Sequence, residues 1–158
     1  MNKNFVFAVQ GEGRGHLTQA IATYELLTSR GHTVAAVLIG SSKRREIPAF
    51  VRERIKAPII TYRSPNFVTC KHNKSIRITS TVLKNLLYWK TFRKSMQLIR
   101  EVMQEYKPDL LLNFYEPLIG VCSLFKKFDC KIVSIAHQYI YLHPSFSFPK
   151  EASKREAY

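Results

Sequence analysis

The chain has 158 residues, of which 46% are hydrophobic and 12% aromatic, a composition typical of one globular domain. No stretch approaches the roughly 18 uninterrupted apolar residues that a membrane-spanning helix requires. Lys and Arg number 25 against 11 Asp and Glu, so the net charge is 25 − 11 = +14. This charge favours anionic partners and leaves open nucleic acid, an anionic membrane surface and a phosphorylated ligand.

The absence of certain sequence motifs excludes some of these candidate partners. The sequence has no helix-turn-helix signature, no aromatic RNA-binding motif and no zinc module, so we expect no nucleic-acid partner. The three cysteines, Cys70, Cys122 and Cys130, lack metal-ligand spacing, so we expect neither a disulfide framework nor a metal site. The amino terminus leads into a strand without an apolar signal segment, which predicts a cytoplasmic location.

The first predicted elements surround a glycine-rich turn. The apolar run over residues 5–10 predicts a buried strand, and residues 17–29 predict an amphipathic helix. Between them lies the glycine turn, residues 11–16 (GEGRGH). Residues 32–39 predict a second strand, so this region has the strand–helix–strand order of a parallel sheet.

The glycines of this turn predict positive φ angles and a close approach of the backbone to a ligand. A dinucleotide-binding turn would have its third glycine at position 16, where this chain has His. It would also have an acidic residue after the second strand, where this chain has GSSKRR, from Gly40 to Arg45. This basic run leaves an NADP-binding oxidoreductase domain open as a weaker alternative.

The remaining predicted elements alternate between helix and strand. Periodicity predicts a basic helix over 43–55, a strand over 58–62, a long helix over 80–106, a strand over 109–114, a helix over 116–128 and a strand over 131–136. The apolar positions of the long helix, expected to face the core, are Val82, Leu86, Trp89, Phe92, Met96, Ile99, Met103 and Tyr106. The alternation predicts an α/β fold with a Rossmann-like, doubly wound parallel sheet.

Three segments follow strand ends in this predicted sheet: the glycine turn, residues 113–116 and residues 137–138. Ligands of such sheets bind beyond the carboxyl ends of the strands. We therefore expect one face to collect Gly11, Gly13, Arg14, Gly15, His16, Asn113, Glu116, His137 and Gln138.

The segments GEGRGHLTQA and LLTSRGHTV resemble the N-terminal half of the two-domain, GT-B type glycosyltransferases. The likeness is strongest to uncharacterised bacterial and archaeal members and looser to the peptidoglycan lipid-intermediate N-acetylglucosaminyltransferase. The shared pattern over residues 5–39 is a strand, Gly-x-Gly-x-Gly-His, a helix, Arg-Gly-His and a strand. DLLLNFYEP and KIVSIAHQ look like that family's fourth and fifth strands, so the resemblance covers nearly the whole chain.

The resemblance implies one GT-B half-domain. Residues 1–145 would form the N-terminal, acceptor-binding domain, and residues 146–158 a charged tail or the start of a linker to a missing C-terminal domain. The chain alone would bind no cofactor and be inactive, whereas the full-length enzyme would use a nucleotide-sugar donor and a sugar or lipid-linked acceptor. A stand-alone subunit that recruits a separate catalytic chain stays open as an alternative.

The resemblance also implies residue roles. In several relatives the histidine that matches His16 deprotonates the acceptor hydroxyl, a task that suits an imidazole with a pKa near neutrality. Helix capping is the alternative role for His16. Relatives often orient this histidine with an Asp near the end of the fourth strand, where this chain offers Glu116, whose alternative role is a first-turn helix carboxylate. Acceptor or phosphate binding would involve Gly11, Gly13, Arg14, Gly15, Asn113, His137 and Gln138.

The long predicted helix also combines basic and aromatic side chains, with Lys90, Arg93 and Lys94 beside Trp89 and Phe92. This combination favours anionic lipid surfaces, although so regular an apolar stripe is more often part of a core. With a lipid-linked acceptor, the docking face would be the loop over 63–77 and the start of this helix, at the inner face of a membrane.

Overall fold

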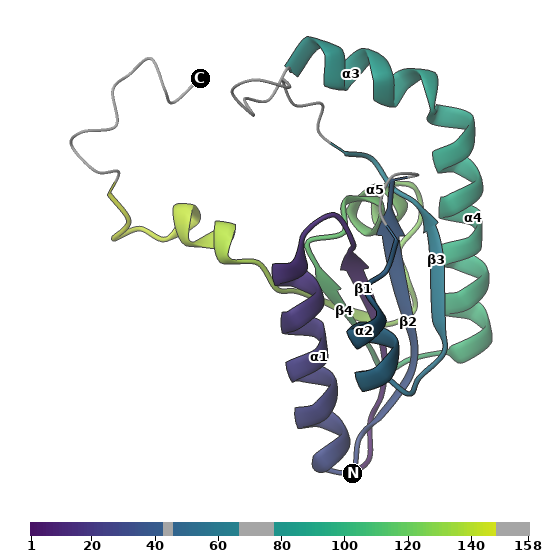
Figure 1. The fold of residues 1–158 in the computed structure, drawn as a ribbon, viewed down its shortest axis with the longest axis vertical. Helices are drawn as coiled ribbons and strands as arrows, with labels where there is room; N and C mark the ends of the chain where they lie inside the picture. Colours follow the sequence, from purple (N-terminus) through teal and green to yellow (C-terminus); the bar gives the residue numbers. More distant parts are fainter. Residues whose placement is uncertain (43–45, 67–77, 148–158) are drawn as a thin grey trace.

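A computed structural model describes residues 1–42, 46–66 and 78–147 of the chain. Its strands form one five-stranded parallel sheet in the order β3-β2-β1-β4-β5 (Figure 1). The strands are β1 (Asn4–Gln10), β2 (Thr33–Ser41), β3 (Ile59–Arg63), β4 (Leu110–Phe114) and β5 (Lys131–Ser134). The doubly wound parallel sheet predicted from the sequence is therefore confirmed.

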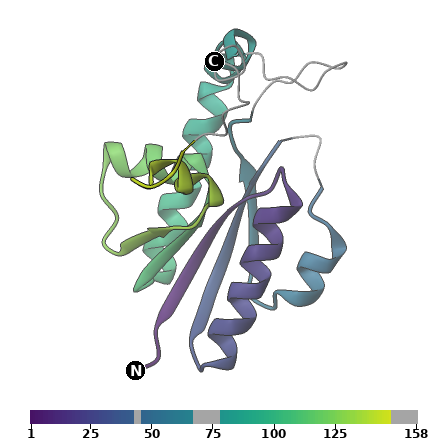
Figure 2. The same ribbon diagram turned by 90° about the vertical axis from the view of Figure 1, so that its left-hand side faces the viewer.

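Helices cover both faces of the sheet (Figures 1 and 2). Helices α1 and α2 lie on one face, and α4 and α5 lie on the other. The helices are α1 (Arg14–Ser29), α2 (Ala49–Arg54), α3 (Ile78–Leu87), α4 (Trp89–Tyr106) and α5 (Pro117–Phe125), followed by the 3-10 helix η1 (His137–Leu142). None of the helices in these described ranges is long and apolar enough to pass through a bilayer.

The central strand shows why the sheet is buried on both sides. Phe5, Phe7 and Val9 of β1 pack into the core beneath α1 and α2. Val6 and Ala8, which point the other way, pack into the core beneath α4 and α5. Because both faces need apolar side chains, the strands read as nearly continuous apolar runs.

The single long helix predicted over residues 80–106 is wrong. The structure has two helices there, α3 and α4, which meet at Tyr88 with φ −90° and ψ 10°. Helix α4 has 18 residues and is therefore about 27 Å long, while the nine-residue β2 is about 30 Å long. Since α4 already covers the length of the sheet, α3 extends past the carboxyl ends of the strands (Figure 1).

This break divides the apolar stripe predicted for the long helix. Phe92, Met96, Ile99 and Met103 of α4 are buried in the core, as predicted. The residues predicted as core that are instead exposed are Val82, Leu86 and Trp89. Helical spacing is the same along both segments, but only α4 has a sheet to pack against.

Other boundaries differ at the element ends. Within the helix predicted over 43–55, the described residues 46–48 are not helical and α2 covers only 49–54, because Pro48 disfavours helical backbone in the residue before it. The helix predicted to end at residue 128 ends at Phe125, and the last strand ends at Ser134. The charge run at residues 43–45, most of the predicted loop and the charged tail from residue 148 lie outside the described residues.

Candidate functional site

Two strand ends meet at the centre of the sheet. Strands β1 and β4 pair in parallel, from Phe5 opposite Leu110 to Val9 opposite Phe114. The strand order reverses between them, which makes this the switch point where doubly wound sheets bind ligands. The structure thus places the glycine turn after β1 beside residues 113–116, which include the last two residues of β4 and the two that follow it.

The backbone of the glycine turn differs from the expected one. None of Gly11, Gly13 and Gly15 has a positive φ, so that prediction is wrong. Gly11 is instead needed for packing, because its N–H donates to the carbonyl oxygen of Gly40 at 2.7 Å and a Cβ would lie 2.8 Å from the Ile39 side chain. Gly13 and Gly15 have open space at the Cβ position, which leaves room for a ligand to approach the backbone.

Glu12 attaches this turn to the neighbouring strand. Its Oε1 accepts a hydrogen bond from the backbone N–H of Ser42, directly after β2. The first two residues of the turn, Gly11 and Glu12, are therefore both attached to the end of β2.

His16 lies in the first turn of α1 and is 9% exposed. Its imidazole stacks on the ring of Tyr115, with ring centroids 5.4 Å apart and planes 19° from parallel. The N-cap of α1 is Gly13, and no side chain caps it, so the structure does not support helix capping as the role of His16. The contact with Tyr115 joins the start of α1 to the turn after β4.

Tyr115 is not among the site residues predicted from the sequence, nor are Tyr62 and Ser64, which lie near Glu116. Its φ of 59° lies in the left-handed region, which is uncommon for residues other than glycine. The Oδ1 of Asn113 accepts a hydrogen bond of 2.8 Å from the backbone N–H of Glu116 and closes the turn around Tyr115. Strained backbone of this kind persists where surrounding contacts fix it, often at functional sites.

Glu116 is 1% exposed and lies at the start of α5. Its Oε1 accepts hydrogen bonds from the hydroxyl of Ser64 at 2.6 Å and from the backbone N–H of Leu118 at 3.1 Å. Burial raises the pKa of this carboxyl group to about 7, although both hydrogen bonds act in the opposite direction. Glu116 is therefore the N-cap of α5, one position before the first turn expected for its alternative role, and its carboxyl group is about half protonated near neutral pH.

The second oxygen of this carboxyl group lies in a buried polar cluster. Among the described residues, neither Oε2 of Glu116 nor the hydroxyl of Tyr62 has a hydrogen-bond partner. Burial, together with the nearby Glu116 carboxylate, raises the pKa of Tyr62 well above its usual value. Gly40 makes space for the cluster, because a Cβ there would overlap the Glu116 carboxyl group and Ser64.

A cavity of about 400 Å³ opens beside these residues. Amide and hydroxyl side chains supply most of its polar groups, which suits hydrogen bonding to a polar ligand such as a sugar. It is lined by Gln10, Pro65, Asn66, Thr81, Asn85, Asn113, Tyr115, Glu116, Pro117, Gly120, Ser134 and Tyr139. A second cavity of about 280 Å³ involves Pro108, which precedes β4, so it lies at the opposite end of the sheet from His16.

Comparison with known proteins identifies the family. The sequence matches the family model described as Glycosyl transferase family 1 over residues 3–158. The chain belongs to this glycosyltransferase family. A comparison with curated proteins finds no significant match.

Solved glycosyltransferases share the fold of this domain. The structure of CalG4, the calicheamicin glycosyltransferase, is similar with a TM-score of 0.51 and 18% identity, over 84% of this chain and 32% of that one. The glycotransferase of kitacinnamycin is similar with a TM-score of 0.52 and 16% identity, over 99% of this chain and 34% of that one. The domain therefore spans about one third of the length of these structures.

These findings confirm the predicted likeness to the N-terminal domain of GT-B glycosyltransferases at the level of family and fold. The looser likeness to the peptidoglycan enzyme stays a prediction. So do the division at residue 145 and the roles assigned to the individual site residues.

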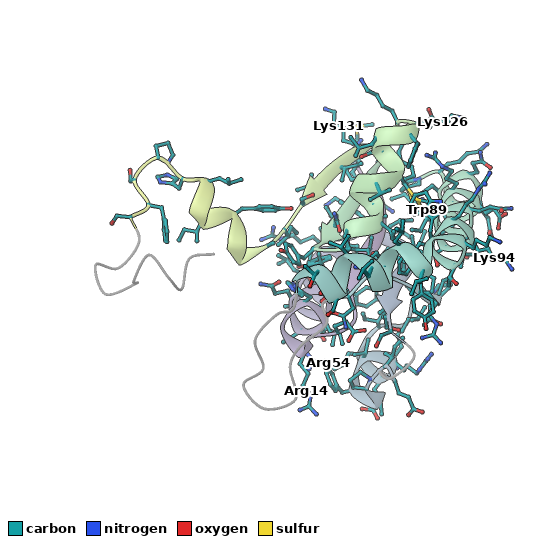
Figure 3. The ribbon with its side chains drawn as sticks, turned by 90° about the horizontal axis from the view of Figure 1, so that it is seen from above. Arg14, Arg54, Trp89, Lys94, Lys126 and Lys131 are labelled. Atoms are coloured by element: carbon teal, nitrogen blue, oxygen red, sulfur yellow. The ribbon has the colours of Figure 1, made fainter. Side chains whose placement is uncertain are left out.

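The other predicted site residues of the glycosyltransferase domain lie at the starts of η1 and α1. His137 and Gln138 begin η1 soon after β5, and their side chains are outside what the structure describes. Helix η1 leads away from the sheet (Figure 1). Arg14 is exposed at the start of α1 and points outward (Figure 3).

Two further predictions concern cofactors. The three basic residues expected to bind a phosphorylated ribose, residues 43–45, are outside the described part, so the NADP alternative stays a prediction. Within the described ranges, no group of three His, Cys, Asp or Glu side chains is placed to hold a metal ion.

Proposed function

We propose that this chain is the acceptor-binding half of a nucleotide-sugar-dependent glycosyltransferase, with His16 as the general base. The position of His16 carries the proposal. The imidazole lies at the switch point of the sheet, is held against Tyr115, and Tyr115 in turn lines the 400 Å³ cavity. A second domain, which would hold the nucleotide-sugar donor, would complete the site from the opposite side.

The proposed reaction uses His16 in one step. The acceptor oxygen forms a bond to the anomeric carbon of the donor, the bond from that carbon to the nucleotide phosphate breaks, and the hydroxyl proton passes to the neutral imidazole. The first turn of α1 has no side-chain cap and no acidic residue, which favours an anionic phosphate near its N–H groups. Gly13 and Gly15 leave space for that approach.

Glu116 would act as a positioning residue in this scheme. Its polar contacts are made with Ser64 and with the backbone of α5, and Tyr115 is held in the turn just before it. The cavity, lined by Asn113 and Gln10 among others, would bind the acceptor through hydrogen bonds to its hydroxyl groups.

The test is His16→Ala in a protein that joins this chain to a donor-binding domain. Loss of the base should lower the rate of sugar transfer by about 10²–10⁴-fold, measured as release of nucleoside diphosphate with a panel of nucleotide-sugars and acceptors. His32→Ala is the matched control, because His32 lies at the other end of the sheet and accepts a hydrogen bond from the N–H of Lys3. Equal transfer by wild type and His16→Ala would contradict the assignment.

A further inference from the structure

Helix α3 has its apolar side on the outside of the molecule. Thr81 and Asn85, one turn apart, line the 400 Å³ cavity and so face inward. The side chains on the opposite side of the helix are apolar and between 60% and 84% exposed: Val82, Leu83, Leu86 and Leu87. This is the reverse of an ordinary surface helix, whose apolar side faces the core.

The apolar surface continues across the junction with α4. Tyr88 and Trp89 are 49% and 44% exposed. We define the α3 patch as these two residues together with Val82, Leu83, Leu86 and Leu87 of α3. The helix that carries most of the patch extends beyond the sheet, so the patch is not part of either core (Figure 1). Exposed apolar surfaces of this kind usually mark an interaction site.

The surroundings of the α3 patch are basic. Lys90, Arg93 and Lys94, in the first turns of α4, are exposed. Between Arg54 and Arg100 the sequence contains no Asp or Glu at all. Figure 3 shows Trp89 and Lys94 on the α4 side of the molecule, while Arg14 and Arg54 lie on the side of α1 and α2.

We propose that the α3 patch docks on an anionic membrane surface. Its leucines would enter the boundary of the acyl chains, as in helices that lie flat in the membrane interface. Tyr88 and Trp89 are of the residue types that prefer the headgroup level, and Lys90, Arg93 and Lys94 would meet the anionic lipids. A protein partner fits less well, because most protein interfaces need directional polar contacts, and α3 directs Thr81 and Asn85 inward. The docking is independent of sugar transfer and can be tested without it.

Trp89 offers a direct readout, because it is the only tryptophan of the chain. The whole chain would be titrated with phosphatidylcholine vesicles that contain about one third phosphatidylserine, at low ionic strength. We expect a blue shift of the Trp89 emission, protection of Trp89 from acrylamide and sedimentation of the protein with the vesicles. Salt at roughly 0.5 M should weaken the binding, and vesicles of phosphatidylcholine alone should bind less.

Two pairs of variants locate the contact. Leu86→Ser with Leu87→Ser should weaken vesicle binding at least about tenfold, whereas Leu124→Ser with Phe125→Ser, on α5 and also exposed, should not change it. Replacing Lys90, Arg93 and Lys94 by Gln should weaken binding roughly 100-fold, at about fivefold per charge. Replacing Lys126, Lys127 and Lys131 by Gln removes the same charge elsewhere and should have a much smaller effect. Circular dichroism would verify that each variant is folded.

Several results would overturn the proposal. Sedimentation with an unchanged Trp89 spectrum would mean that another face binds the lipid. Equal losses of vesicle binding in the two triple Gln variants would show that net charge, and not the position of the charges beside the α3 patch, determines the binding. No binding to anionic vesicles would leave the α3 patch as a protein contact, including one with a further part of a longer polypeptide.

Discussion

At the level of single residues, the carboxyl group of Glu116 is the most heavily constrained feature of the site. It caps α5, accepts the Ser64 hydroxyl and occupies the space that Gly40 leaves free. Deep burial without a described partner for Oε2 favours the protonated form. Protonation of Glu116 is thereby coupled to the stability of the turn that follows β4, next to His16.

Glu116→Gln should change how stability depends on pH. The folded-state pKa of Glu116, about 7, lies above its ordinary value of 4.5, so the folded protein binds this proton more tightly than the unfolded chain. The stabilisation is fully present below pH 4.5 and is lost as pH rises through 7, a loss of roughly 3 kcal/mol in the free energy of unfolding. Glu116→Gln, which mimics the protonated form, should lack this loss.

Urea unfolding of both proteins from pH 5 to 8 measures the effect, and titration of all other groups cancels in the comparison. If the free energies of unfolding of wild type and Glu116→Gln change in parallel with pH, the raised pKa of Glu116 is wrong.

Gly40→Ala should destabilise the protein by roughly 1–3 kcal/mol, as overpacking of a core does. The new methyl group would overlap the carboxyl group of Glu116 and Ser64. Gly120→Ala is the control, because nothing lies within 4 Å of its Cβ position and alanine favours a helix by roughly 1 kcal/mol. Thermal unfolding would compare the two, and a Gly40→Ala protein as stable as wild type would show that the cluster has spare room.

At the level of elements, α3 and α4 differ in what they pack against. Ile99→Ala in α4 removes a fully buried side chain and should cost roughly 2–5 kcal/mol in the free energy of unfolding. Leu86→Ala in α3 removes an exposed one and should cost less than about 0.5 kcal/mol. Denaturant unfolding measures both, and similar losses would indicate that α3 belongs to the core after all.

The same two helices show what the sequence does and does not predict. The order of strands and helices follows from apolar periodicity, because each element must bury one side against its neighbours. Periodicity identifies which residues share a side of a helix but not what that side faces. Val82 and Phe92 therefore looked equivalent, and only the length of the sheet separates them.

The location of the site was also predictable from the sequence, but the details of its backbone and packing were not. The rule for strand carboxyl ends correctly placed the glycine turn beside residues 113–116. It could not reveal the positive φ of Tyr115, because left-handed backbone is typical of Gly, Asn and Asp and a Tyr in the sequence does not predict it. Nor could it show that Gly11 is required by Ile39 and Gly40, residues from a different strand.

At the level of the whole molecule, a net charge of +14 opposes folding through repulsion among like charges. Raising NaCl from roughly 0.01 M to 0.15 M shortens the Debye length from about 30 Å to about 8 Å and should raise the unfolding temperature by roughly 2–4 °C. Differential scanning calorimetry measures this rise in the unfolding temperature. The variant with Gln at Lys126, Lys127 and Lys131 should show a smaller rise, and a flat or falling unfolding temperature would contradict the prediction.

The strand order also has a consequence for the time course of folding. Strands β1 and β2 are neighbours in the sheet and close in the sequence, so they can pair early. Strand β4 also pairs with β1, but it begins at Leu110, after β3, α3 and α4 have been made. His16 and Tyr115 are 115 − 16 = 99 positions apart, so their stacking can form only after this long-range pairing, the slow kind of contact in folding. On a ribosome, the helix that carries His16 would therefore emerge long before the ring that holds it in place.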